Sequence, residues 1–146
     1  MSEVEIYAQL SNSTISTALW AMVFAFLLWV AGRAATVALE SNAGIIMKIA
    51  VTVFGLVNLW QFNLSGSFFR FNFDSAGHSL AVLKDTGETI SARAEQLISN
   101  TGATTDVPTI SLMPDLIGGL FVLSAAYLII GRDRKFQAIQ IGRAHV

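Results

Sequence analysis

Residues 15–32, ISTALWAMVFAFLLWVAG, form a run of eighteen residues without a formal charge. A helix rises about 1.5 Å per residue, and the hydrocarbon core of a bilayer is roughly 30 Å thick. Extended through residue 39, the run is long enough to cross a membrane with some tilt. It therefore predicts a transmembrane helix over residues 15–40. Cleavage near Ala35 as a secretory signal peptide is the alternative, although the acidic N-terminus does not favour it.

The composition agrees with a membrane protein. The 146-residue chain is 53% hydrophobic and 13% charged, which is too apolar for an ordinary soluble domain. Its net charge of −1 indicates no basic surface for nucleic acid. Because it has no cysteine and only two histidines, we expect no metal site and no cofactor. The expected fold class is an all-α integral membrane protein with one membrane domain.

Two further apolar segments predict transmembrane helices over residues 45–69 and 112–131. Between the first two spans lies Ser41-Asn42-Ala43-Gly44. Asn and Gly tolerate the left-handed conformation that ends a helix, so these residues predict a turn and an antiparallel hairpin. Pro114 and Asp115 are typical of a helix start, which places the third span after them.

The remaining segments are more polar. Residues 1–14 carry two carboxylates and no basic side chain, and they predict an N-terminal tail ending in candidate helix caps at residues 11–14. Residues 68–73 alternate aromatic and polar side chains, which indicates an interfacial belt with a short strand-like extension. Residues 70–110 predict a small loop module with a short amphipathic helix on the membrane or against a partner. Its apolar stripe comprises Leu80, Leu83, Ile90, Ala94 and Leu97.

Small residues recur at seven-residue spacing in two of the predicted spans. In lipid, helices associate through close van der Waals packing, so such stripes predict helix-packing faces. The alternative is that alanine is simply common in membrane helices. The stripe residues are Ala18, Ala21, Ala25 and Gly32 in the first span, and Gly118, Gly119, Ala125 and Ala126 in the third.

Polar side chains also occur within or beside the spans. An amide in hydrocarbon needs a partner, so we expect Asn58 to face another helix, a polar cavity or a second copy of the chain. Structural hydrogen bonding is the default interpretation, and a polar pore lining is the alternative. Arg33 can extend its side chain to the headgroups, with an anion or proton site as the alternative. The intramembrane polar set is Arg33, Lys48, Thr52, Asn58, Gln61 and Ser65.

Catalytic chemistry is weakly indicated. Asp85-Thr86-Gly87 matches the aspartic-protease tripeptide, but a single copy in a polar segment is better explained by a turn. His78 has no spaced nucleophile or carboxylate partner and is expected to face solvent. With no base, nucleophile and orienting group, we expect no catalytic residues and no enzyme activity.

The last six residues, IGRAHV at 141–146, are what the common sequencing-adapter sequence ATCGGAAGAGCACACGTC encodes. We interpret them as an artefact that replaces the native C-terminus. The native sequence would then be lost after about residue 139, so that residues 132–139 are the genuine part of a basic tail.

The distribution of Lys and Arg predicts the orientation. Cytoplasmic loops are enriched in these residues, and they occur beside the first turn and after the third span. We therefore predict a multi-pass protein with residues 1–14 and 70–110 outside and the turn and residues 132–146 in the cytoplasm. This layout resembles that of three-span phage holins, a resemblance of architecture that implies pore formation.

Three possible functions follow from these patterns. The packing stripes favour a non-catalytic accessory or structural subunit of a larger membrane complex. The alternatives are an oligomeric pore or a fragment of a larger transporter. The expected partners are the lipid bilayer and other membrane-protein helices in a homo- or hetero-oligomer, and no nucleic acid.

Overall fold

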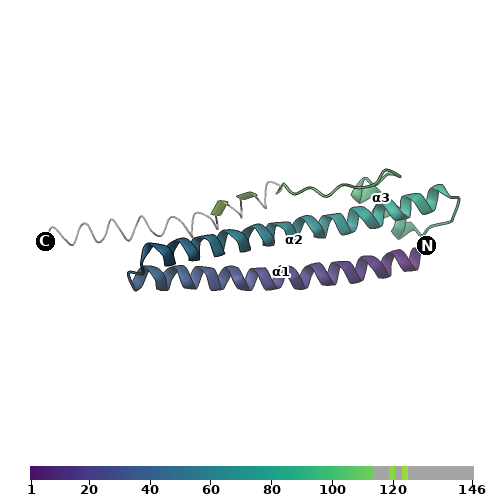
Figure 1. The fold of residues 1–146 in the computed structure, drawn as a ribbon. Helices are drawn as coiled ribbons and strands as arrows, with labels where there is room; N and C mark the ends of the chain where they lie inside the picture. The colour runs from purple at the N-terminus through teal and green to yellow at the C-terminus, as the bar shows by residue number, and fades with distance from the viewer. Residues whose placement is uncertain (114–118, 121–122, 125–146) are drawn as a thin grey trace. The chain divides into compact units, whose positions relative to one another are not determined.

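The computed structural model describes residues 1–113, 119–120 and 123–124. It has three helices, α1 (Glu3–Glu40), α2 (Ile45–Asp85) and α3 (Ala92–Thr101), and no strand among the described residues (Figure 1). The prediction of an all-helical chain with two long apolar helices is confirmed. The predicted span at 112–131 falls mostly outside the described residues, and the tail at 132–146 falls entirely outside them.

Helix α1 begins at Glu3, so the expected N-terminal tail is helical and the candidate caps at residues 11–14 are wrong. The start is a capping box. The Ser2 hydroxyl accepts from the Glu5 amide at 3.4 Å, and the Glu5 carboxylate accepts from the Ser2 amide at 2.7 Å. Because these contacts satisfy amides that lack intrahelical partners, the helix starts well before its apolar section.

The expected turn joins α1 to α2. Asn42 has a left-handed backbone with φ 49°. The Ala43 amide donates to the Ala38 carbonyl, and the Asn42 amide donates to the Leu39 carbonyl. This pair of bonds is the Schellman motif, which satisfies carbonyls that the end of a helix leaves free.

Helix α2 continues through residues 68–73 and ends at Asp85, so the strand-like extension is wrong. In the helix, Phe69 and Phe73 are four residues apart, and their ring centroids lie 5.5 Å apart. The segment contains no proline to stop the helix. It ends at the expected turn, where Gly87 adopts φ 87°.

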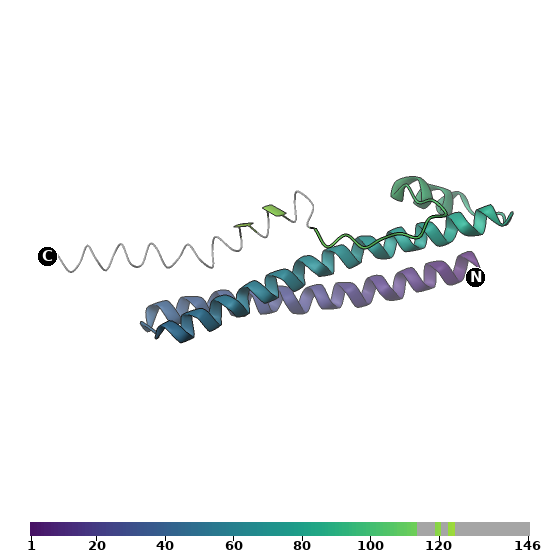
Figure 2. The same ribbon diagram turned by 45° about the horizontal axis from the view of Figure 1, so that its top comes forward.

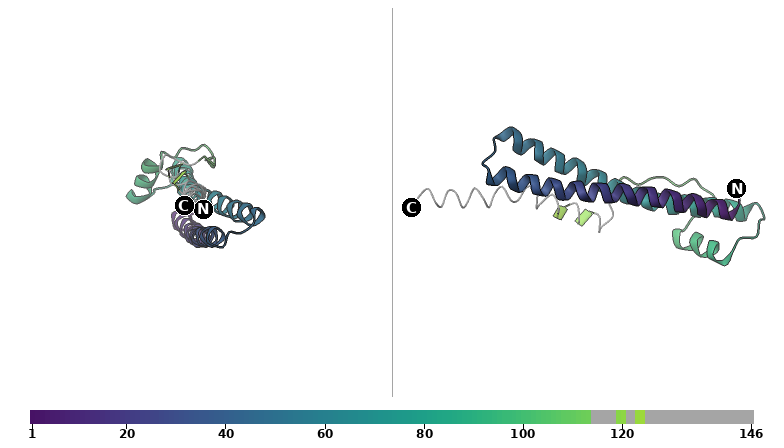
Figure 3. Two further views of the ribbon diagram at one scale, coloured as in Figure 1. Left: turned by 90° about the vertical axis from the view of Figure 1, so that its left-hand side faces the viewer. Right: turned by 90° about the horizontal axis from the view of Figure 1, so that it is seen from below.

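Helix α3 lies in the segment whose apolar spacing predicts a short amphipathic helix. Ser91 caps its start, with its hydroxyl accepting from the Ala94 amide. Gly102 ends it with φ 64°. Figures 2 and 3 show α3 folded back beside the C-terminal part of α2.

The chain divides into two compact units, and α1 and α2 each contribute a portion to both. The first, which we call the α3 module, comprises residues 1–20 and 64–113. The second comprises residues 21–63 and 114–146; we call its residues 21–63 the apolar hairpin.

Both long helices are apolar enough to cross a membrane. Only 6% of the most apolar window in α1 and 17% of that in α2 is buried. The central helix of a soluble domain would instead bury such a window. At about 1.5 Å per residue, each helix is also roughly twice as long as a 30 Å hydrocarbon core requires.

Candidate functional site

The α3 module has a hydrophobic core of its own. Its buried residues come from all three helices: Ile6 from α1, Ala76 and Leu80 from α2, and Ala94 from α3. Partly buried apolar side chains surround them: Tyr7, Leu10, Leu83, Ile90, Leu97 and Ile98. The predicted apolar stripe therefore packs inside the chain, together with α1 residues that the sequence analysis did not assign to it.

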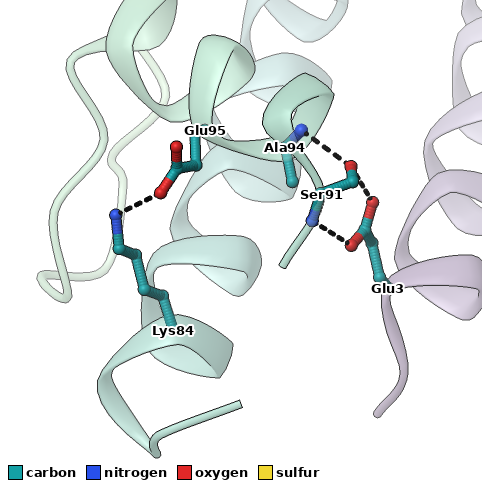
Figure 4. A network of polar contacts seen from close by, with 5 residues as sticks. All are labelled: Glu3, Lys84, Ser91, Ala94 and Glu95. Carbon is teal, nitrogen blue, oxygen red and sulfur yellow. Dashed lines mark hydrogen bonds and ion pairs between the residues drawn. The ribbon is translucent and has the colours of Figure 1, made fainter. Parts of the chain in front are cut away.

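Glu3 ties the start of α1 to the start of α3 (Figure 4). Its carboxylate accepts one hydrogen bond from the Ser91 hydroxyl and another from the Ser91 amide, the latter at 2.9 Å. Ser91 simultaneously caps α3 through the Ala94 amide. One serine thus joins a local helix cap to a contact across 88 positions of sequence.

Both carboxylates of the α1 start are stabilised in their charged form. The Ser91 hydroxyl and then its amide lower the pKa of Glu3 below its ordinary value. The Ser2 amide, followed by the Ser2 hydroxyl, lowers the pKa of Glu5. Hydrogen bonds donated to a carboxylate favour its ionised state.

Two charged contacts lie at the edge of the module's core. Lys84 of α2 donates to Glu95 of α3 at 2.9 Å, with both side chains more than half exposed. The Arg93 guanidinium lies 5.4 Å from the centroid of the Tyr7 ring, a cation–π distance. The Tyr7 hydroxyl is buried without a hydrogen-bond partner, and this burial is the main cause that raises the pKa of Tyr7.

The C-terminal end of α3 and the residues after it pack closely on α2. Gly77 is buried, and a Cβ placed there would lie 2.5 Å from the Thr101 Oγ1 and 2.9 Å from the Ala103 Cβ. The neighbouring His78 is half-buried, and its Nδ1 lies 3.0 Å from the Thr104 carbonyl. Since a carbonyl only accepts, Nδ1 carries the proton in this contact. His78 therefore keeps part of its surface exposed and also contacts the segment that follows α3.

A groove with a mixed polar and apolar lining lies between α1 and α2 within the α3 module. It has a volume of about 160 Å³, and its polar lining includes Gln9, Ser13, Asn72 and Ser75. Asn72 donates to the Thr17 hydroxyl at 3.0 Å. In this unit, α1 and α2 are therefore held together both by polar side chains and by the apolar core.

The apolar hairpin holds a larger groove of about 420 Å³ close to its turn. Trp29, Val37 and Met47 are among its lining residues, and Arg33 is the charged residue that reaches it. Among the described residues of α1, Ala31 and Ala38 are the buried small residues of this unit.

The predicted small-residue stripe does not coincide with the buried face of α1. Ala25 is exposed, and Ala18, Ala21 and Gly32 are only partly buried. Gly119 is also partly buried, whereas Gly118, Ala125 and Ala126 lie outside the described residues. The use of these positions for packing stays a prediction.

The predicted polar residues of α2 are more buried than Arg33, which is the one predicted polar residue of α1. Asn58 is 5% exposed and Ser65 is 6% exposed. The side-chain amide of Asn58 donates from Nδ2 to the Phe54 carbonyl at 2.7 Å. The Thr52 hydroxyl donates to the Lys48 carbonyl at 2.9 Å. Such bonds to the preceding turn satisfy a polar side chain on its own helix. Gln61 and Lys48 are partly buried, and Arg33 is exposed.

Within the described residues, no three His, Asp or Glu side chains gather where a metal ion could bind. No known protein family, curated protein or solved structure matches the chain.

Proposed function

We propose that the chain is a non-catalytic accessory subunit of a membrane complex, anchored by the apolar hairpin and presenting the α3 module at the membrane surface. The observation that carries the proposal is the contrast between the two units. The apolar windows of α1 and α2 leave most of their surface exposed, whereas the α3 module buries a core beneath polar contacts. Exposed apolar surface of this kind suits lipid and other membrane helices.

The contact between Glu3 and Ser91 supports an even number of spans between these two residues, which the two long apolar helices would supply, and it leaves the predicted third span over residues 112–131 untested. Residues that touch through a hydrogen bond lie on the same side of a membrane, so both ends of the hairpin emerge together. The turn at residues 41–44 then lies on the opposite side.

The distribution of charged side chains supports an orientation of the hairpin in the membrane. The α3 module carries seven carboxylates and three basic side chains, while Arg33 and Lys48 flank the turn. Because basic residues favour the cytoplasmic side, the turn is cytoplasmic and the module is outside.

The burial of two polar side chains of α2 favours a subunit over a pore lined by those side chains. Residues that line a pore between copies must be accessible, but Asn58 and Ser65 are buried within this chain. Ala25 of the small-residue stripe is instead exposed, which allows another helix to approach closely at that position.

Substituting two positions of the small-residue stripe tests the proposal. Ala25→Leu or Gly32→Leu should obstruct close approach and shift the complex to a smaller size in chemical cross-linking of intact membranes and in mild detergent. Val23→Leu is the matched control, since Val23 is also exposed on α1 but does not belong to the stripe. Its complex should keep the wild-type size, and circular dichroism should show equal helix content in all variants.

The pore alternative makes a different set of predictions. If the purified chain makes liposomes leak, and Asn58→Leu abolishes the leak while assembly survives, the chain is a pore former. An unchanged complex size in both stripe variants would also contradict the subunit proposal.

A further inference from the structure

The groove near the turn of the apolar hairpin has the chemistry of a lipid site. Its volume of about 420 Å³ lies in the range of roughly 300–1,000 Å³ that is usual for small-molecule pockets. Most of its lining is apolar, and α1 and α2 both contribute to it. The residues that matter to the argument are Trp29, Arg33, Ala34, Val37, Met47 and Val51.

Arg33 brings a positive charge to this apolar lining. Its side chain is exposed, and among the described residues it forms no hydrogen bond or ion pair. A guanidinium is always charged and offers a planar set of donors that matches the oxygens of a phosphate. The groove therefore combines an apolar surface with an unused anion-binding group.

The position of Arg33 along α1 suits a phospholipid headgroup. Arg33 precedes the end of the helix at Glu40 by seven residues, which is about 10 Å of helix. Each headgroup layer adds roughly 5–7 Å to the hydrocarbon core, and a long basic side chain extends toward it. With the turn at the membrane surface, the guanidinium reaches the level of the lipid phosphates.

We propose that this groove binds one anionic phospholipid, with the phosphate on Arg33 and an acyl chain along the apolar lining. The proposal rests on the membrane placement of the hairpin argued above. Lys48 also carries a positive charge near the turn but does not line the groove, so it supplies a matched control.

Trp29 lines the groove and can report its occupant. Full-length protein with Trp20→Phe and Trp60→Phe keeps Trp29 as its single tryptophan. It is reconstituted in vesicles that contain phosphatidylcholine and phosphatidylglycerol, with bromine on the acyl chains of one lipid at a time. Bromine quenches a neighbouring tryptophan, so the two quenching curves give the relative affinity of the groove for each lipid.

We expect a preference of about fivefold for phosphatidylglycerol, the effect of one basic residue near an anionic surface. Arg33→Gln should bring the preference close to one, Arg33→Lys should retain part of it, and Lys48→Gln should leave it unchanged. Ala34→Phe fills the groove without altering charge, and it should reduce the preference as well.

Equal quenching by the two lipids in the protein with native Arg33 would overturn the lipid site. An equal loss of preference in Lys48→Gln and Arg33→Gln would also overturn it, because a diffuse surface charge would then suffice. Absence of quenching by either lipid would instead show that the hairpin is outside the bilayer, which is the separate failure of the proposed function.

Discussion

At the scale of single residues, the hydrogen bonds between Glu3 and Ser91 link α1 to α3 in the α3 module. Ser91 is a helix cap that the local sequence can explain, because serine accepts from the free amides of a first turn. Its contact with Glu3 adds a long-range constraint on the same side chain. Loss of that contact should therefore loosen α3 without unfolding the apolar hairpin.

The contact should depend on pH. The pKa of Glu3 is lowered in the folded chain, so its contribution to stability is complete above the ordinary value of 4.5. It is lost as the pH falls through the lowered pKa, when the carboxylate gains a proton. Amide hydrogen exchange of α3, followed by mass spectrometry from pH 6 downward, should show protection decreasing in this acid window.

Two glutamine variants separate this effect from general acid sensitivity. Glu3→Gln should reduce α3 protection at neutral pH and remove most of its pH dependence. Glu5→Gln changes a carboxylate whose partner is Ser2, so α3 should retain its pH dependence. Equal pH profiles for Glu3→Gln and the unchanged protein would contradict the role of this contact.

At the scale of elements, the close approach of the C-terminal end of α3 to α2 depends on Gly77. Gly77→Ala would place a methyl group against Thr101 and Ala103, so one of the segments must move. We expect faster amide exchange in α3 and a destabilisation of about 1–3 kcal/mol, the usual cost of overpacking.

Gly66 provides the matched control on the same helix. A Cβ at Gly66 meets no atom within 4 Å, and alanine favours a helix over glycine. Gly66→Ala should leave α3 exchange unchanged. Similar acceleration in both variants would indicate that α2 flexibility, and not the packing at Gly77, controls the docking of α3.

At the scale of the whole molecule, the hydrogen bond between Glu3 and Ser91 constrains the topology. Ser99 in α3 and Ser41 in the turn are both exposed serines, and the chain contains no cysteine. In intact cells, Ser99→Cys should react with a membrane-impermeant thiol reagent, and Ser41→Cys should react only after lysis. The reverse pattern would invert the orientation, and labelling of both before lysis would contradict a spanning hairpin.

The sequence determined the elements that depend on local chemistry. Uninterrupted apolar runs predicted two long helices, and Asn42 and Gly87 marked turns because they tolerate a left-handed backbone. The start of α1 was also readable, since Ser2 and Glu5 have the spacing of a capping box, although the longer apolar run drew the prediction toward residue 15.

The tertiary structure alone decided which distant residues meet. Ile6 joins the core that Leu80 and Ala94 share, and Glu3 reaches Ser91, although neither pairing leaves a local pattern in the sequence. Helical periodicity describes the face of one element, but it does not specify the neighbour that covers that face. The buried face of α1 at Ala31 and Ala38 lies one residue from the predicted Gly32 stripe for the same reason: burial depends on where the partner helix lies.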